Sequence, residues 1–366
     1  METQVDLIGR NGAEGEIAGQ LISNGNLNVG SFRPFYDVKT KRNYITTFKG
    51  GDAKDPANYV TVPINTNATL RRDEWKQLDD AIMEPSRYRL GGVEDLISRG
   101  LTFNLGNAMG TTVLEWHDVS EAMEASLTMD GVTRSPGDRP KFQHNYLPIP
   151  IIHVDYEINA RVLEASRKLG NPLDTTSAER AARKVGEKME DMLFTNTTYS
   201  FGESDTRGRN SIYSYVNHPD RNTVNLSIPW DNSAITGAGI IQDVLEAKQS
   251  SIDAYHYGPW MLYIPTEYET VLDNDYDATT PGTTIRERIM KISGISGIKV
   301  VDTLTADNLL LVQMTPDVVR LVRGMGLQNV EWTTEGRFIT KYKVLTIQVP
   351  QIRSDQNGKS GIVHIS

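Results

Sequence analysis

The fold is decided by residues 148–196, which read PIPIIHVDYEINARVLEASRKLGNPLDTTSAERAARKVGEKMEDMLFTN. The apolar run at residues 148–154 predicts a strand, and residues 157–171 lead from it into a long charged helix that begins near Ser177. Thr176 followed three residues later by Glu179 fits a capping box at the start of this helix. A strand that feeds a long two-faced helix is therefore the central unit of the chain.

Apolar residues recur on this helix at the spacing of a single stripe, which predicts one buried face and one solvated face. The stripe is formed by Ala178, Ala181, Ala182, Val185, Met189, Met192 and Leu193. The rest of the surface is covered by Arg180, Arg183, Lys184, Glu187, Lys188, Glu190 and Asp191. Because the acidic side chains offset the basic ones, we expect a solvated face of mixed charge that interacts only weakly with nucleic acid.

A long hairpin is predicted upstream of the strand. In its outgoing strand, residues 112–117, Leu114 and Trp116 share one face while Glu115 and His117 share the other. Turn signals mark a tip at residues 129–140. Prolines in the return strand cannot donate to a ladder, so one edge of the hairpin is expected to be free for a partner surface. Two helices before the hairpin, near residues 71–83 and 92–99, are expected to be divided by Glu84-Pro85.

Residues 1–69 do not predict a compact domain, because they are rich in Asn and Gly with brief apolar runs. Their aromatic residues are nevertheless too many for a solvated linker: Phe32, Phe35, Tyr36, Tyr44, Phe48 and Tyr59. We interpret the segment as an arm that becomes ordered against neighbouring copies of the chain.

From about residue 238 the pattern alternates between helices and strands. Helices are expected at 239–255, with Leu245 among the buried residues, and at 284–292, and a third helix is expected to be capped by Thr266. Strands are expected at 260–264, 298–301, 309–314 and 318–323. A last long strand at 337–353 is expected to return to the first domain. Two interleaved α/β domains fit this order better than two consecutive ones.

Composition excludes several kinds of chemistry. The 366 residues carry a net charge of −9 and contain no cysteine. Disulfides, thiolate zinc sites and cysteine nucleophiles are thereby excluded, and the charge argues against a dedicated nucleic-acid binder. No apolar run reaches the ~18–20 residues of a membrane span, and no secretory leader is seen. We therefore expect a protein made in a cytoplasm.

No catalytic, cofactor or metal motif is found. Residues 273–277, DNDYD, imitate the start of a calcium loop, but Ala278 stands where glycine is needed and Thr284 where a bidentate Glu belongs. We interpret them as an acidic loop at a helix C-terminus. The six histidines show no metal-ligand spacing, and phosphate-binding loops and nucleophile elbows are absent. We therefore expect no catalytic residue, no cofactor and no metal.

Five short segments carry a resemblance to a known family: LISRGLTF (96–103), SLTMDGVTR (126–134), LPIPIIH (147–153), LEASR (163–167) and LDTT (173–176). They resemble major capsid proteins of tailed bacteriophages with the Hong Kong ninety-seven type capsid fold, in the encapsulin-like branch. The resemblance implies an α+β chain in six parts. These are an N-terminal arm (1–69), helices of the P-domain side (70–110), an extended hairpin or E-loop (111–150), the P-domain with its spine helix at about 177–195 (151–237), the A-domain (238–330) and a return strand to the P-domain (331–366).

The resemblance also implies a structural function without enzyme activity. Copies would self-assemble as pentamers and hexamers into an icosahedral head that encloses double-stranded DNA, contacted only non-specifically and without a membrane. Separate scaffolding, portal or decoration proteins are the further partners, and the location is the virion, assembled in the bacterial host cytoplasm. The candidate subunit-interface residues are Arg134, Arg139, Lys141, Phe32, Phe35 and Tyr44.

Alternatives remain open at this point. An encapsulin-type compartment around cargo enzymes shares most of the implied fold, although the long N-terminal arm counts against it. An α/β enzyme would need a convergent polar pocket, which the sequence does not offer. Some members of the resembled family form Lys–Asn isopeptide bonds between subunits. Lys141 with Asn357 or Asn329 could be proposed for such a bond, but turn chemistry and solvation explain these residues as well.

Overall fold

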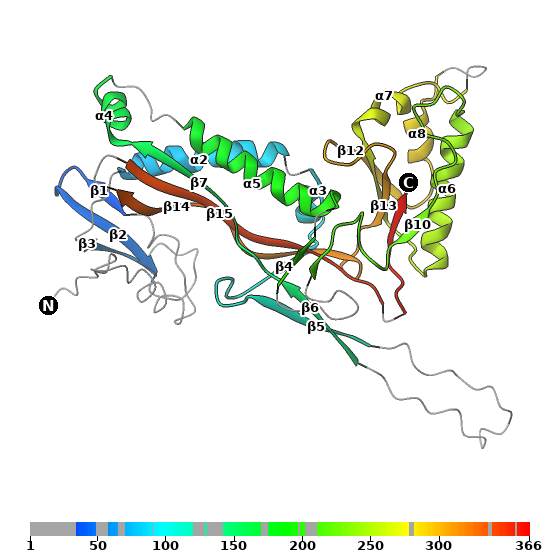
Figure 1. Cartoon of the computed structure of the whole chain (residues 1–366), viewed down its shortest axis with the longest axis horizontal. Coiled ribbons are helices and arrows are strands. Elements are labelled where there is room, and N and C mark those ends of the chain that lie inside the picture. The colour runs from blue at the N-terminus through cyan, green and yellow to red at the C-terminus, as the bar shows by residue number, and fades with distance from the viewer. Residues whose placement is uncertain are drawn as a thin grey trace.

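The computed structural model describes residues 34–48, 58–64, 70–89, 91–119, 129, 142–169, 175–196, 198–201, 211–277, 282–335, 339–355 and 357–366. The described chain forms an elongated body with two hydrophobic cores (Figure 1). The larger, central core lies along a long sheet and its covering helices, and the second core fills a lobe at one end of the body.

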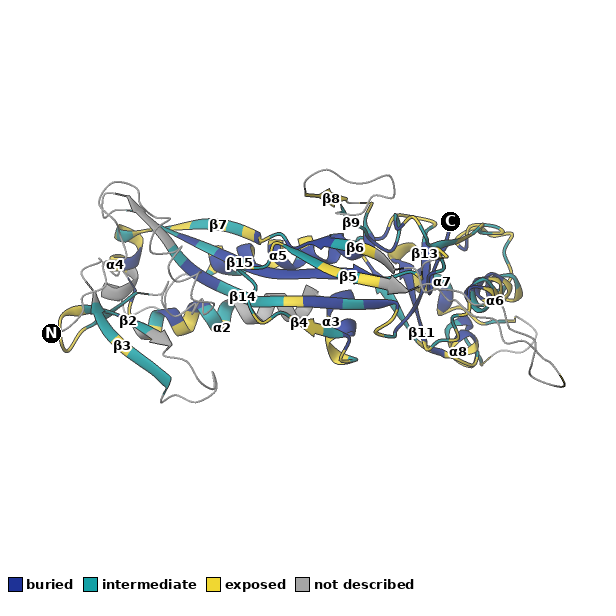
Figure 2. Ribbon diagram, turned by 90° about the horizontal axis from the view of Figure 1, so that it is seen from below, coloured by how far each residue is buried: buried dark blue, intermediate teal, exposed yellow. Residues whose placement is uncertain are grey.

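The central sheet has four strands in the order β4-β14-β15-β7. Their bounds are β4 Thr102–Asn104, β7 Ile152–Asn159, β14 Val319–Glu335 and β15 Ile339–Ile352. The antiparallel pair β14–β15 forms the long axis of this sheet (Figure 2). Residues 346–352 of β15 are buried, whereas residues 323–328 of β14 are exposed or half-buried. Residues 339–345 of β15 alternate between buried and half-buried, as expected for a strand with one face on the core.

Three helices cover one face of this sheet: α2 (Arg72–Arg89), α3 (Gly91–Ser98) and α5 (Thr176–Phe194). The predicted spine helix is α5, and every residue of its predicted apolar stripe is buried. Its predicted cap is wrong by one residue. Thr175 is the N-cap, and its hydroxyl lies 2.7 Å from a carboxylate oxygen of Glu179.

The predicted break at Glu84-Pro85 is also wrong, because α2 continues through Pro85 to Arg89. An interior proline costs about 3 kcal/mol or more. Tertiary packing of the first half of α2 offsets that cost: Trp75 and Leu78 are buried, and the Trp75 ring lies edge-on to Tyr342 of β15 at 5.8 Å. The second predicted helix, at residues 92–99, is α3.

The second core is built on a five-stranded sheet in the order β10-β16-β13-β11-β12. Its strands are β10 Asn222–Val224, β11 Trp260–Pro265, β12 Ile295–Val301, β13 Leu309–Gln313 and β16 Ile362–Ile365. Its helices are α6 Gly237–Asp253, the 3₁₀ turn η3 Thr266–Tyr268, α7 Glu269–Leu272 and α8 Ile285–Met290. Every residue of β11 is buried, which explains its unbroken apolar sequence.

Caps in this lobe differ partly from expectation. Thr284 accepts a hydrogen bond from the Glu287 amide and begins α8 as predicted. Thr266, predicted to cap a helix, instead begins the 3₁₀ turn, and α7 has no side-chain cap. In α6, Leu245 was expected to be buried but is 39% exposed.

The expected domain limits 151–237, 238–330 and 331–366 do not follow the two cores. β10 precedes residue 238 yet belongs to the second sheet, and β16 returns to that sheet after β15. The predicted short strand at 318–323 is the beginning of β14, which belongs to the central sheet. The chain therefore crosses between the cores more often than the periodicity indicated, because pairing between distant strands leaves no local pattern.

The remaining described elements lie around the central sheet. A three-stranded sheet at the N-terminal end holds β1 (Phe35–Asp37), β2 (Arg42–Phe48) and β3 (Tyr59–Ile64), so part of the predicted arm is ordered against its own chain. The others are β5 Val113–Val119, β6 Phe142–Pro148, α4 Ala160–Leu169, β8 Tyr199–Ser200 and β9 Ser211–Ile212. No described helix has both the length and the apolar character that a membrane crossing requires.

The apolar run at residues 148–154 is not one strand. β6 ends at Pro148, and β7 begins at Ile152 in the central sheet. Because proline cannot donate to a ladder, Pro148 and Pro150 mark the point at which the chain leaves the hairpin and enters the central sheet.

Candidate functional site

The projecting hairpin is formed by β5 and β6. The two strands pair over their whole length, and in the described part of the chain neither pairs with a third strand. Figure 1 shows the hairpin leaving the body on the side of the central sheet opposite α5. Leu114 and Trp116 pack against the central core, whereas Glu115 and His117 are exposed, as their alternation predicted. Unpaired strand edges of this kind can accept a strand or loop from another chain.

The predicted interface residues fall into two groups. Those outside the described residues are Arg134, Arg139, Lys141 and Phe32. Phe35 and Tyr44 are described, and their rings stack in neighbouring strands with centroids 6.1 Å apart. Phe35 also packs against the central core. That Phe35 and Tyr44 face a neighbouring copy therefore stays a prediction, although both already have contacts within their own chain.

Asn329 cannot serve as the acceptor of a bond to a lysine of another subunit. It is fully buried, and its side-chain amide donates to the Tyr156 hydroxyl at 2.6 Å. Asn357 is exposed, and its backbone N–H donates to Asp355 in a turn. The lysine proposed with them, Lys141, lies outside the described residues.

The calcium-like run begins at the C-terminal cap of the four-residue helix α7, as interpreted from the sequence. The Asp273 side chain forms an ion pair with Arg286 at 2.8 Å. The backbone of the next aspartate, Asp275, pairs with that of Thr284 in an isolated antiparallel β-bridge. The run thus closes the loop that leads into α8.

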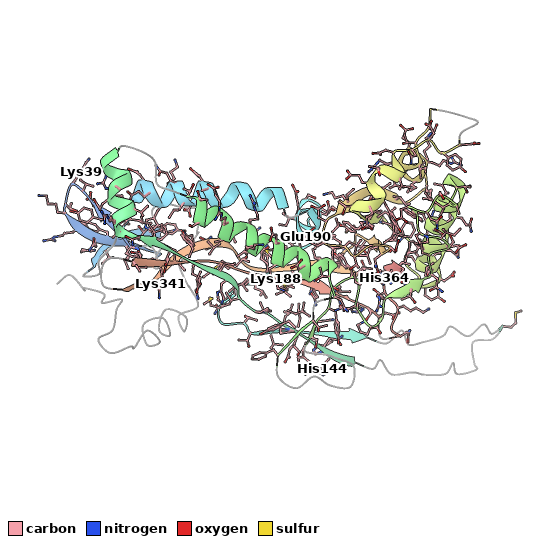
Figure 3. All side chains as sticks on the ribbon, turned by 45° about the horizontal axis from the view of Figure 1, so that its top comes forward. Lys39, His144, Lys188, Glu190, Lys341 and His364 are labelled. Atoms are coloured by element: carbon pink, nitrogen blue, oxygen red, sulfur yellow. The ribbon has the colours of Figure 1, made fainter. Side chains whose placement is uncertain are left out.

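The solvated face of α5 is more basic than its sequence indicated. Its exposed cations are Arg180, Arg183, Lys184 and Lys188. Glu187 pairs with Lys184 at 2.7 Å, but Glu190, expected on this face, is 7% exposed and turns toward α3 (Figure 3). The expectation that Glu190 offsets the basic charge is therefore wrong, because its carboxylate is used inside the protein.

The Glu190 carboxylate caps α3. Its two oxygens accept hydrogen bonds from the Gly92 amide at 2.9 and 3.2 Å, across 98 residues of sequence. A carboxylate at this place also interacts favourably with the positive end of the helix. One turn later, Asp95 of α3 accepts from the Tyr263 hydroxyl of β11 at 3.0 Å and pairs with Lys299 of β12 at 2.5 Å. Thus α3 joins the spine helix to the sheet of the second core, and we call this set of residues the junction cluster.

Burial dominates the electrostatics of the junction cluster. It raises the pKa of Glu190 to about 7, with a further increase from the nearby Asp95, while the α3 amides and Lys299 oppose the shift. Burial likewise holds the pKa of the Tyr263 hydroxyl well above its usual value. The Tyr215 hydroxyl is fully buried and has no hydrogen-bond partner among the described residues.

Sequence reasoning missed the junction cluster. One local signal was present for Glu190: its neighbours at i−4, i+3 and i+4 are Gly186, Leu193 and Phe194, all of them buried. No sequence pattern links Glu190 to Asp95, Tyr263 and Lys299, because they come from four separate elements.

Replacing Gly92 with Ala is expected to destabilise the fold by about 1–3 kcal/mol through overpacking. An added Cβ would lie 2.4 Å from Cε2 of Phe194, whose ring is fully buried between Tyr215 and Tyr263. The gain in helix propensity, at most about 1 kcal/mol, does not offset this. Denaturant unfolding followed by fluorescence measures the change.

The matched control is Gly106→Ala, since nothing lies within 4 Å of a Cβ at that position. Gly106→Ala should leave the unfolding midpoint nearly unchanged. Equal midpoints for the two variants would contradict the packing shown at Gly92.

Solved structures with the same arrangement are shell proteins. The virus-like particle of Pyrococcus furiosus superposes with a TM-score of 0.56 at 17% identity, over 80% of this chain and 99% of that one. The capsid of Myoviridae Phage XM1 superposes with a TM-score of 0.55 at 9% identity, over 74% of this chain and 90% of that one. The capsid of a native GTA particle superposes with a TM-score of 0.52 at 11% identity, over 73% of this chain and 88% of that one. The chain therefore has the Hong Kong ninety-seven type capsid fold, a mixed helix-and-sheet fold that belongs to shell-forming proteins.

Residues 65–365 match a sequence family described as "Family of unknown function (DUF6260)", and the chain belongs to that family. A curated relative is the type 1 encapsulin shell protein EncA of Myxococcus xanthus. It is 24% identical over 213 residues, which are 57% of this chain and 66% of the relative. The chain thus spans just under two thirds of that relative's length.

Proposed function

We propose that this protein is the structural subunit of a closed icosahedral shell, and specifically the major capsid protein of a tailed phage that encloses double-stranded DNA. The observation that carries the proposal is the β5–β6 hairpin, which projects from a capsid-type fold with both outer edges unpaired in the described chain. Many modest contacts repeated around a closed shell add through avidity, so no single interface needs to be strong.

The parts of the subunit receive roles under this proposal. The hairpin, whose tip is predicted at residues 129–140, acts as the E-loop that lies over an adjacent copy. α5 and the central sheet form the P-domain, and the second core forms the A-domain that gathers around pentamer and hexamer axes. The N-terminal segment, residues 1–69, contacts neighbouring copies as an arm through Phe32, Phe35 and Tyr44, in addition to the contacts within the chain.

The proposed partners follow from the same assignment. The exposed Arg and Lys side chains of α5 give packaged DNA a weak, non-specific contact, since such binding depends on phosphate neutralisation alone. Scaffolding, portal and decoration proteins are separate partners. The subunit acts without enzyme activity, resides in the virion and is assembled in the cytoplasm of a bacterial host.

The second candidate function is an encapsulin-type compartment that encloses cargo enzymes. The similarity to the Myxococcus xanthus encapsulin shell protein favours it. The two candidates share the assembly step and differ in what the shell contains.

Electron microscopy of the full chain expressed alone tests the assembly step. Uniform hollow shells are expected, and their diameter sets the copy number. If only small oligomers form, co-expression with the adjacent genes follows, and failure to form shells there too would contradict the proposal. Nuclease-resistant DNA in particles from the native source would support the phage head, and co-purified enzymes without such DNA would support the compartment.

A further inference from the structure

The exposed face of the β5–β6 hairpin holds two histidines side by side. His117 of β5 lies directly opposite His144 of β6 in the antiparallel ladder (Figure 3 labels His144). Both side chains are exposed, and their ring centroids are 4.3 Å apart with the planes at 85°. The ladder fixes the two Cβ atoms about 4.5–5.5 Å apart, so the pair is pre-positioned by the backbone of two strands.

This spacing suits chelation of one metal ion. Two imidazole nitrogens that share an ion lie at most about 4.2 Å apart, because each Zn–N bond is about 2.0–2.1 Å. Rings with centroids 4.3 Å apart reach that separation through a rotation about χ1 and χ2. Imidazole suits copper, nickel and zinc, and it does not suit calcium or magnesium, which take oxygen ligands.

A carboxylate on the same face favours a cation. Glu115 lies two residues before His117 on the same face of β5 and is exposed, and Tyr146 stands opposite it. Among the described residues, no three His, Cys, Asp or Glu side chains are grouped closely enough to hold a metal ion. The pair therefore supplies two protein ligands, and water completes the coordination.

We propose that His117 and His144 chelate one divalent transition-metal ion, Cu²⁺, Ni²⁺ or Zn²⁺, on the exposed face of the hairpin. The proposal stands on the strand register and ring geometry alone. It does not depend on whether the protein assembles into a shell.

Pulsed electron paramagnetic resonance of Cu²⁺ added below one equivalent to the untagged full chain tests it, because the method distinguishes one coordinated imidazole from two and tolerates large particles. The wild-type protein is expected to show two imidazoles coordinated to one Cu²⁺ ion. His117→Gln and His144→Gln should each abolish the two-imidazole signal. Each should also lower the Zn²⁺ association constant, measured by titration calorimetry, by about tenfold or more.

His153 provides the matched control, since it is an exposed histidine on a strand whose polar contact is Asp155 at 3.5 Å. His153→Gln should keep the two-imidazole signal. A wild-type spectrum with a single imidazole, or an unchanged two-imidazole spectrum in His117→Gln or His144→Gln, would overturn the proposal. Far-UV circular dichroism and particle size without metal verify that the substitutions leave the fold intact.

Discussion

Replacing residues 120–141 with an Asn-Gly turn is expected to abolish shell formation and leave a folded subunit. Val119 and Phe142 are paired across the ladder, so a two-residue turn can join them without changing the register. Under the proposed function this segment is what lies over the adjacent copy, and its contact is repeated at every subunit of the shell. Sedimentation velocity and electron microscopy measure the loss, and circular dichroism verifies the fold.

A finer variant separates the predicted contacts from the length of the loop. Reversing the charge at Arg134, Arg139 and Lys141 together should impair assembly. The same triple reversal at the exposed residues Arg180, Arg183 and Lys184 of α5 should not, since these residues face solvent on another element. If the chain with the Asn-Gly turn still formed normal shells, residues 120–141 would not be needed for assembly and the prediction would be wrong.

Replacing Glu190 with Gln is expected to stabilise the protein above pH 7 by on the order of 2–3 kcal/mol. The pKa of Glu190 is about 7 in the folded state against an ordinary value of 4.5, so the folded state holds an extra proton between these two values. The contribution of Glu190 to stability is largest below pH 4.5, falls as the pH rises and is fully lost above pH 7. Gln keeps an oxygen that can accept from the Gly92 amide and carries no charge. Urea unfolding of the Glu190→Gln variant and the wild type at pH 5 and pH 8 measures the difference.

Glu190→Ala is the companion variant. It leaves the buried Gly92 N–H without its acceptor and should cost about 1–3 kcal/mol at pH 5. At pH 8 this cost should largely disappear, because the wild type has by then lost the stability that Glu190 contributes at low pH. The charged groups around Glu190 are Asp95 of α3 and Lys299 of β12, with Tyr263 and Tyr215 as the neighbouring hydroxyls. An equal effect of Glu190→Gln at pH 5 and pH 8 would show that the carboxyl does not titrate in this window.

Much of the architecture could be predicted from the sequence where the signal is local. The stripe of α5 and the alternation in β5 were both correct, because side-chain period follows directly from helix and strand geometry. The strand expected at residues 260–264 is also correct, since it is β11. The overall capsid fold followed from resemblance in short segments, which periodicity by itself would not have found.

The errors have a common cause. The end of α2, the length of β14 and the return of β16 to the second sheet all depend on partners far away in the chain. Packing of Trp75 on Tyr342 tolerates a proline that local rules take as a stop. The predicted interface residues at the hairpin tip remain predictions, since they lie outside the described residues.

The sequence by itself determined which faces of its helices and strands are apolar and that cysteine chemistry is absent. Only the tertiary structure decided that Glu190 leaves the solvated face to cap α3, and that His117 meets His144 across a ladder. The physical reason is that periodicity records how a residue sits on its own element, whereas the pKa of a carboxyl or the spacing of two imidazoles depends on the groups that a distant element brings beside it.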